Sequence, residues 1–88
     1  MFVIAKLPLG DFRIVQVLDD TDSKNGRQIL QGRQLDDTGK YIRYTDKDHG
    51  VLPAFVGSIK QTWVYVDQVK KTFKTRAELA THLEKQKA

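Results

Sequence analysis

The sequence predicts an α+β domain in which a mostly antiparallel β-sheet of about five strands carries one C-terminal helix. Up to residue 67, apolar and polar side chains alternate over short segments, which is the period of a half-buried strand. Turn-forming Asp and Gly residues separate these segments,. From Thr75 onward the apolar spacing becomes helical, because Leu79 and Leu83 stand four residues apart on one stripe,.

The chain of 88 residues is the size of one domain,. We therefore expect a single domain over residues 1–88, with strands over about 2–67 and a helix over about 75–87. The chain has no cysteine, which excludes disulfides, thiolate metal ligands and a cysteine nucleophile,. Its first residues lack the basic and apolar regions of a signal peptide, and no apolar run is long enough to span a bilayer,. We expect a cytoplasmic protein without membrane contact.

The first part of the chain predicts strands over residues 2–7 and 12–18, joined as a hairpin by Pro8 and Gly10,. Residues 19–26 form the most polar stretch and end in Asn25-Gly26, which favours a mobile hairpin loop,.

A third strand is predicted over residues 27–35, and Gly32 in its middle indicates a bulge or a bend,. Such a corner allows a small sheet to curl strongly or to close into a small SH3-like barrel.

The second part predicts a fourth strand over residues 40–45. Residues 51–59 contain Pro53 and Gly57, so they form an edge strand or an irregular crossing segment,. Residues 61–67 are apolar on both faces, which is typical of a strand that is central in the sheet or covered on both sides,. The helix then starts at a capping box made by Thr75 and Glu78,.

Signals of catalysis are absent from the sequence. His49 and His82 lack metal-ligand spacing, and Ser23 and Ser58 lack the glycine-flanked turn of a nucleophile,. The Asp-rich turns do not follow the calcium-loop pattern, and no glycine-rich phosphate loop occurs,. We expect no enzymatic activity, no cofactor and no metal.

Two weaker signals concern binding. In the first, aromatic and basic residues share predicted strands, with Tyr41 and Arg43 on one and Trp63 on another. Such strands bind single-stranded nucleic acid by base stacking. The alternative is that Trp63 and one or two of the tyrosines are core and barrel-rim residues.

The second signal is a basic cluster near the helix start, formed by Lys70, Lys71, Lys74 and Arg76. Cations there oppose the helix dipole, so the cluster indicates either an anion-binding site or a solvated basic surface. The positive charge of +4 lies entirely in residues 51–88, because residues 1–50 hold eight basic and eight acidic residues.

One stretch resembles a known family. Gly26-Arg27, residues 39–46 and the closing helix are similar to the arm-site DNA-binding domains of tyrosine recombinases. The resemblance implies a three-stranded sheet that enters the major groove, backed by a C-terminal helix. Here two further strands precede the shared part, and a strand containing Trp63 intervenes before the helix.

Taken together, these features favour a small non-enzymatic binding or accessory module that acts through contacts with a protein partner, as a monomer or weak dimer. The alternative is a nucleic-acid-binding domain that uses the basic cluster and the strand aromatics.

Overall fold

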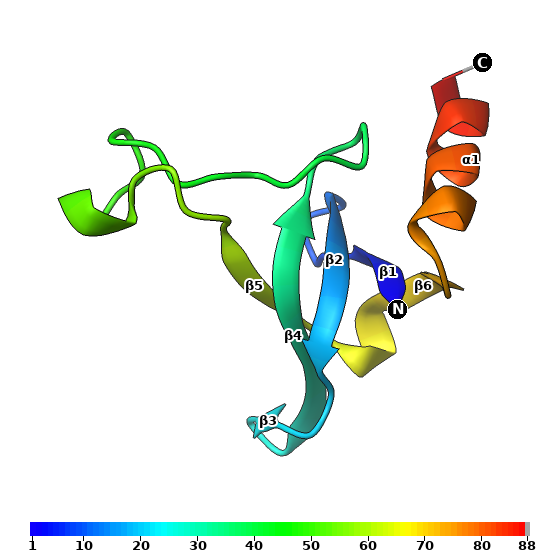
Figure 1. The fold of residues 1–88 in the computed structure, drawn as a ribbon. Coiled ribbons are helices and arrows are strands. Elements are labelled where there is room, and N and C mark those ends of the chain that lie inside the picture. Colours follow the sequence, from blue (N-terminus) through cyan, green and yellow to red (C-terminus); the bar gives the residue numbers. More distant parts are fainter. Residues whose placement is uncertain (88) are drawn as a thin grey trace.

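The computed structural model describes residues 1–87 and shows a six-stranded antiparallel sheet with one C-terminal helix (Figure 1). The α+β prediction is thereby confirmed. The elements are β1 (Phe2–Lys6), β2 (Phe12–Asp19), β3 (Ser23–Lys24), β4 (Arg27–Leu35), the 3₁₀ helix η1 (Pro53–Phe55), β5 (Gln61–Tyr65), the 3₁₀ helix η2 (Val66–Gln68), β6 (Val69–Phe73) and α1 (Arg76–Lys87).

The main part of the sheet has the strand order β5-β4-β2-β1-β6, and the short β3 pairs with the start of β4. β1 and β2 form the predicted hairpin. The sheet is not closed, so the barrel alternative is not realised. Between β5 and β6 the chain winds into η2, where the Val69 amide bonds the Val66 carbonyl.

Gly32 lies at an irregular point of the β2–β4 pairing. The register shifts between Val17 and Asp19, so the extra residue of the bulge is Leu18 on β2. The sequence predicts the irregularity at Gly32, on the partner strand β4. A Cβ atom on Gly32 would lie 1.8 Å from the main-chain oxygen of Gln16. Glycine is therefore required because the two backbones approach too closely for any side chain.

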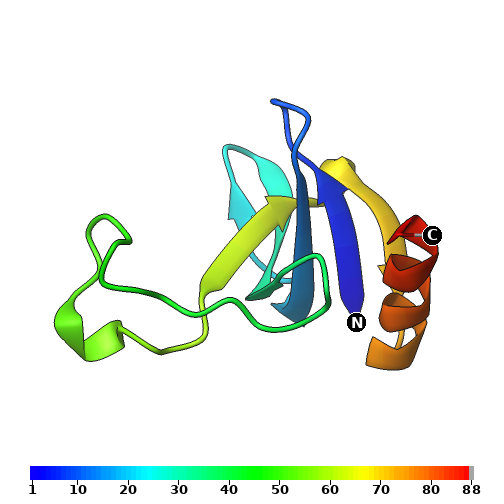
Figure 2. The same ribbon diagram turned by 90° about the horizontal axis from the view of Figure 1, so that it is seen from above.

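Side chains that alternate along β1 divide the core into two layers. Phe2 and Ile4 face α1 and pack with Leu79 and Leu83. The intervening side chains of β1 lie in the second layer, whose buried members are Val3, Ala5, Val15, Leu30 and Val64. Figure 2 shows α1 along the outside of the sheet, beside β1 and β6. Leu79 and Leu83, which the sequence places on one apolar stripe, dock the helix on the sheet.

The helix begins close to the predicted residue. The Thr75 hydroxyl accepts a hydrogen bond of 3.2 Å from the Glu78 amide. The Glu78 carboxylate accepts from the Lys74 amide at 3.3 Å, rather than from Thr75. The Glu78 amide, which the helix leaves unpaired at this end, thus finds a side-chain partner, and a second bond ties Lys74 to the first turn,.

Three strand predictions need correction. Residues 40–45 form only isolated bridges, Leu35 with Tyr41 and Arg43 with Ile59. The strand predicted over residues 61–67 ends at Tyr65, and β5 is an edge strand that pairs only with β4. The segment Val69–Phe73, for which the sequence predicts no strand, is the edge strand β6.

The segment over residues 51–59 is irregular, as one of the two alternatives proposed, and contains η1. No helix within residues 1–87 is long and apolar enough to cross a membrane.

Candidate functional site

The residues of the predicted binding sites are spread over the fold. Lys70 and Lys71 lie on β6 at one edge of the sheet, and Trp63 lies on β5 at the opposite edge. The other four lie in connections or at the helix start: Tyr41, Arg43, Lys74 and Arg76. Among these seven residues, the Arg76 guanidinium contacts the Tyr41 ring. No other two of them that lie on different elements contact each other.

Arg76 turns away from the lysines of the predicted basic cluster. Its Nη1 donates a hydrogen bond of 2.7 Å to the Gly39 carbonyl. Its guanidinium also lies 4.8 Å from the ring centre of Tyr41 and 5.4 Å from that of Phe2. A cation over an aromatic face is stabilised by the ring quadrupole. Arg76 therefore holds the helix start against the connection after β4.

Tyr41 is a packing residue. Its hydroxyl donates a hydrogen bond of 2.6 Å to the Gln16 side chain, and its ring packs against the core layer under α1. Arg33 lies 5.7 Å from the same ring. Tyr41 thus combines packing against the core with contacts to two guanidinium groups.

Trp63 meets Tyr65 edge to face, with ring centres 5.1 Å apart. The Lys24 ammonium lies 4.9 Å from the Trp63 ring, and the Arg27 guanidinium lies 3.6 Å from the Tyr65 ring. Arg27 also forms an ion pair of 2.6 Å with Asp67, whose hydrogen bond raises the pKa of Arg27. The aromatic pair on β5 is thus partly covered by cations from the β3–β4 hairpin.

Between β4 and β5 the chain leaves the sheet and forms an extended projection, here called the arm and defined as residues 42–60 (Figures 1 and 2). Its two sides run antiparallel. The Tyr44 amide donates to Ser58 over 2.9 Å, and the Gly57 amide donates back to Tyr44 over 2.8 Å. Arg43 adds a side-chain bond of 2.8 Å to the Gly57 carbonyl. Arg43 thus fixes the arm internally.

A carboxylate organises the turn within the arm. Asp48 accepts hydrogen bonds from the main chain of Thr45 at 2.7 Å and from its hydroxyl at 3.2 Å. The main-chain bond from Thr45 is the largest effect that lowers the pKa of Asp48, and the Thr45 hydroxyl and the charge of Lys60 act in the same direction. These bonds favour the ionised form and give the turn a defined shape.

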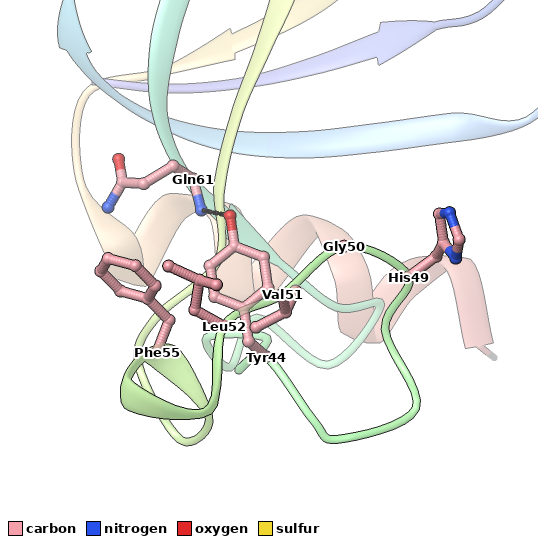
Figure 3. A pocket seen from close by; sticks show the side chains of 7 residues that line it. All are labelled: Tyr44, His49, Gly50, Val51, Leu52, Phe55 and Gln61. Atoms are coloured by element: carbon pink, nitrogen blue, oxygen red, sulfur yellow. Dashed lines mark hydrogen bonds between the residues drawn. The ribbon is translucent and has the colours of Figure 1, made fainter.

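The tip of the arm exposes apolar side chains. Leu52 is 62% exposed, Phe55 53% and Val56 44%. Leu52 and Phe55 line a surface hollow of about 520 Å³, whose other lining residues are Tyr44, His49, Gly50, Val51 and Gln61 (Figure 3). In Figure 3 the His49 side chain points away from the group formed by Leu52, Phe55 and Tyr44.

The hollow is anchored to the sheet at its base. The Tyr44 hydroxyl accepts a hydrogen bond of 3.2 Å from the Gln61 amide at the first residue of β5. The tyrosine ring therefore stands between the arm and the sheet edge (Figure 3). This bond links the arm to the first residue of β5.

Sequence reasoning missed the arm tip as a candidate site, although a signal was present. Residues 51–56 are all apolar and contain Pro53. An apolar segment that proline keeps from forming a central strand is left without a sheet face to cover. Its side chains then either cover another surface or face the solvent.

Within residues 1–87, no three His, Asp or Glu side chains are grouped so that they could hold a metal ion.

No protein-family model, curated protein or solved structure matches this chain. The resemblance to arm-site DNA-binding domains needs a strand over residues 40–45, and that segment forms only two isolated bridges.

Proposed function

We propose that this chain is a non-enzymatic binding module that docks a protein partner through the tip of its arm. The observation that carries the proposal is the exposure of Leu52, Phe55 and Val56 together at the end of a projection. None of them belongs to either layer of the core. Exposed apolar side chains that cluster in one place, and do not stabilise the fold, are typical of protein interaction sites.

The arm is suited to a partner with an apolar, concave surface. Residues 51–56 carry no charge, and Phe55 can serve as the aromatic anchor that interfaces bury near their centre. Transfer of one such side chain from water contributes roughly 1.5–3 kcal/mol. The hollow beside Phe55 and Leu52 can in turn receive an apolar side chain of the partner.

The nucleic-acid alternative has less support. Binding to phosphates needs cations gathered on one surface. Of the predicted site residues, Arg76 bonds Gly39 and Arg43 bonds Gly57, both within the chain. The remaining lysines on β6 lie at the opposite edge of the sheet from Trp63.

A capture experiment with matched variants tests the proposal. The immobilised full chain is incubated with lysate of the source organism, with and without nuclease treatment, beside the double variant Leu52→Ser/Phe55→Ser and the control Leu9→Ser. Leu9 is 94% exposed on the β1–β2 turn and is therefore a matched apolar surface residue. We expect a protein that the wild type and the control retain and that the arm variant loses.

Equal capture by the arm variant would contradict the proposal, as would loss of the captured protein on nuclease treatment. Melting temperatures within about 2 °C of the wild type confirm that the variants are folded, since surface changes away from the core cost little.

A further inference from the structure

We propose that the open edge of β6 accepts an extended, acidic segment of a protein as an additional strand. This second binding surface lies apart from the arm, because β6 and β5 are the two opposite edges of the sheet. The proposal is independent of the function assigned to the arm.

The hydrogen-bond pattern identifies which groups of β6 face outward. The Val17 amide bonds the Met1 carbonyl at 2.9 Å, and the Leu7 amide bonds the Asp11 carbonyl at 2.7 Å. Odd-numbered residues at this end of the chain therefore direct their main-chain groups to the β2 side. Since successive residues point in opposite directions, Phe2 and Ile4 direct theirs to β6.

The partners of Phe2 and Ile4 on β6 are Phe73 and Lys71. Phe73 and Lys71 therefore use their main-chain groups to pair with β1. Thr72, between them, directs its amide and its carbonyl away from β1, to the open edge. Thr72 is exposed, so these groups are available to a new strand.

The other edge of the sheet is blocked. On β5, the Gln61 amide bonds the Tyr44 hydroxyl at 3.2 Å and the Tyr65 amide bonds the Gln68 side chain at 3.1 Å. The Trp63 carbonyl accepts from Arg13 at 2.9 Å. Within the described part of the chain, no side chain bonds a main-chain group of Thr72 in this way. Of the edges formed by β5 and β6, the main-chain groups of β5 are thus occupied, whereas β6 keeps a free pairing edge at Thr72 within residues 1–87.

Charge selects the occupant of this edge. Lys70, Lys71 and Lys74 are exposed, and within residues 1–87 none of them forms an ion pair. Lysines along an edge strand oppose pairing with an identical edge, so a second copy of β6 is disfavoured. An acidic strand meets the same lysines with attraction instead of repulsion.

A hollow of about 380 Å³ beside the edge provides a further contact. It is lined by Phe73, Glu78, Thr81, His82 and Lys85, from the end of β6 and from α1. The rings of Phe73 and His82 lie 5.2 Å apart at its side. A residue of the added strand on the Phe73 side of the sheet would lie next to this hollow. Main-chain bonds then provide affinity, and the hollow provides side-chain selection.

A synthetic peptide tests the inference directly. The probe is an eight-residue peptide that alternates glutamate and valine, titrated to millimolar concentration into the ¹⁵N-labelled full chain. We expect amide shifts confined to residues 70–74 and slower hydrogen exchange at the Thr72 amide. A peptide that alternates lysine and valine is the control and should leave these amides unmoved. No shift with the acidic peptide, or equal shifts with both peptides, would overturn the proposal.

Variants at Thr72 separate main-chain pairing from charge attraction. Thr72→Pro removes an amide that points outward and should lower the affinity for the acidic peptide at least about tenfold. Thr72→Val keeps the amide and should bind as the wild type does. Undiminished binding by Thr72→Pro would contradict the proposal.

If Thr72→Pro does not fold, the variant Lys70→Glu/Lys71→Glu tests the proposal instead. It should no longer bind the acidic peptide and should bind the lysine peptide. Retention of the acidic peptide by this variant would contradict the inference.

Two further titrations identify the class of partner. Single-stranded oligothymidine should leave residues 70–74 unmoved, and if it shifts them while the acidic peptide does not, the edge is a phosphate site and the proposal fails. Leu52→Ser/Phe55→Ser should bind the acidic peptide as the wild type does. Failure of the arm proposal therefore leaves this test intact, and failure at β6 leaves the arm test intact.

Discussion

The Arg76 guanidinium donates a hydrogen bond to the Gly39 carbonyl over 2.7 Å and joins the start of α1 to the turn after β4. Gly39 has φ +84° and is buried, and a Cβ atom there would lie 3.6 Å from the Leu83 side chain. The helix and the turn thus meet through both a charged hydrogen bond and close packing. Arg76, one of the four cations that the sequence groups near the helix start, thus ties the helix to this turn.

The first prediction follows from this contact. Arg76→Ala should lower the free energy of unfolding by about 2 kcal/mol, because it removes a charge-assisted hydrogen bond and a cation over two aromatic rings. Lys74→Ala, two residues earlier and exposed, should change it by less than about 0.5 kcal/mol. Urea unfolding measures both. Equal effects would show that Arg76 is an ordinary surface cation.

The second prediction concerns the docking of the helix. Leu79 is fully buried against the sheet, so Leu79→Ala should cost roughly 2–4 kcal/mol of stability through lost burial and a residual cavity. Ala77→Ser lies on the exposed side of the same helix and should cost well under about 1 kcal/mol. Guanidinium denaturation distinguishes the two. A small effect of Leu79→Ala would mean that α1 is an appendage.

The third prediction tests the close approach of β2 and β4. Gly32→Ala places a methyl group 1.8 Å from the Gln16 oxygen, so the pairing must shift and stability should fall by more than about 3 kcal/mol. Gly57→Ala meets no neighbouring atom and suffers only from its φ of +91°, at a cost of about 1 kcal/mol. In thermal unfolding, the melting temperature of Gly32→Ala should lie well below that of Gly57→Ala. The reverse order would refute the assigned cause.

The fourth prediction concerns acid stability. The Thr38 hydroxyl bonds the Asp36 carboxylate and, with the Thr38 and Lys40 amides, lowers its pKa, while burial opposes the shift. A carboxyl group with a lowered pKa in the folded state stabilises the fold above its unfolded pKa. This contribution is lost as the pH falls through the folded value. Wild type should therefore exceed Asp36→Asn in stability at pH 7, and the difference should shrink below about pH 4. A difference independent of pH would exclude this cause.

Most strands and the helix could be predicted because their apolar period is local. The alternation in β1 and β2 and the Leu79–Leu83 spacing need no knowledge of distant partners,. β6 could not be recognised, because Lys70 and Lys71 interrupt its alternation and β1, its partner, lies at the other end of the chain. Residues 40–45 do alternate, yet Tyr41 bonds Gln16 and Arg43 bonds Gly57. The first contact holds Tyr41 to β2 through its side chain, and the second holds Arg43 to the far side of the arm.

The candidate site was harder to predict than the fold. Spacing along the chain groups Arg76 with the lysines, but the Gly39 carbonyl attracts its guanidinium to the other side of the helix start. The apolar character of residues 51–56 was readable, whereas their exposure depends on the arm projecting from the sheet (Figure 1). Exposure is a property of the tertiary fold, which no local pattern specifies.

The central claim is that the arm tip contacts a protein partner, and site-specific photo-cross-linking tests it most directly. A benzoylphenylalanine residue replaces Phe55 in one full-length variant and Lys85, an exposed residue of α1, in another. Irradiation in cells of the source organism should yield one defined cross-linked protein from position 55 that position 85 does not give. No specific adduct at position 55, or the same adducts from both positions, would contradict the assignment of the arm as the binding element.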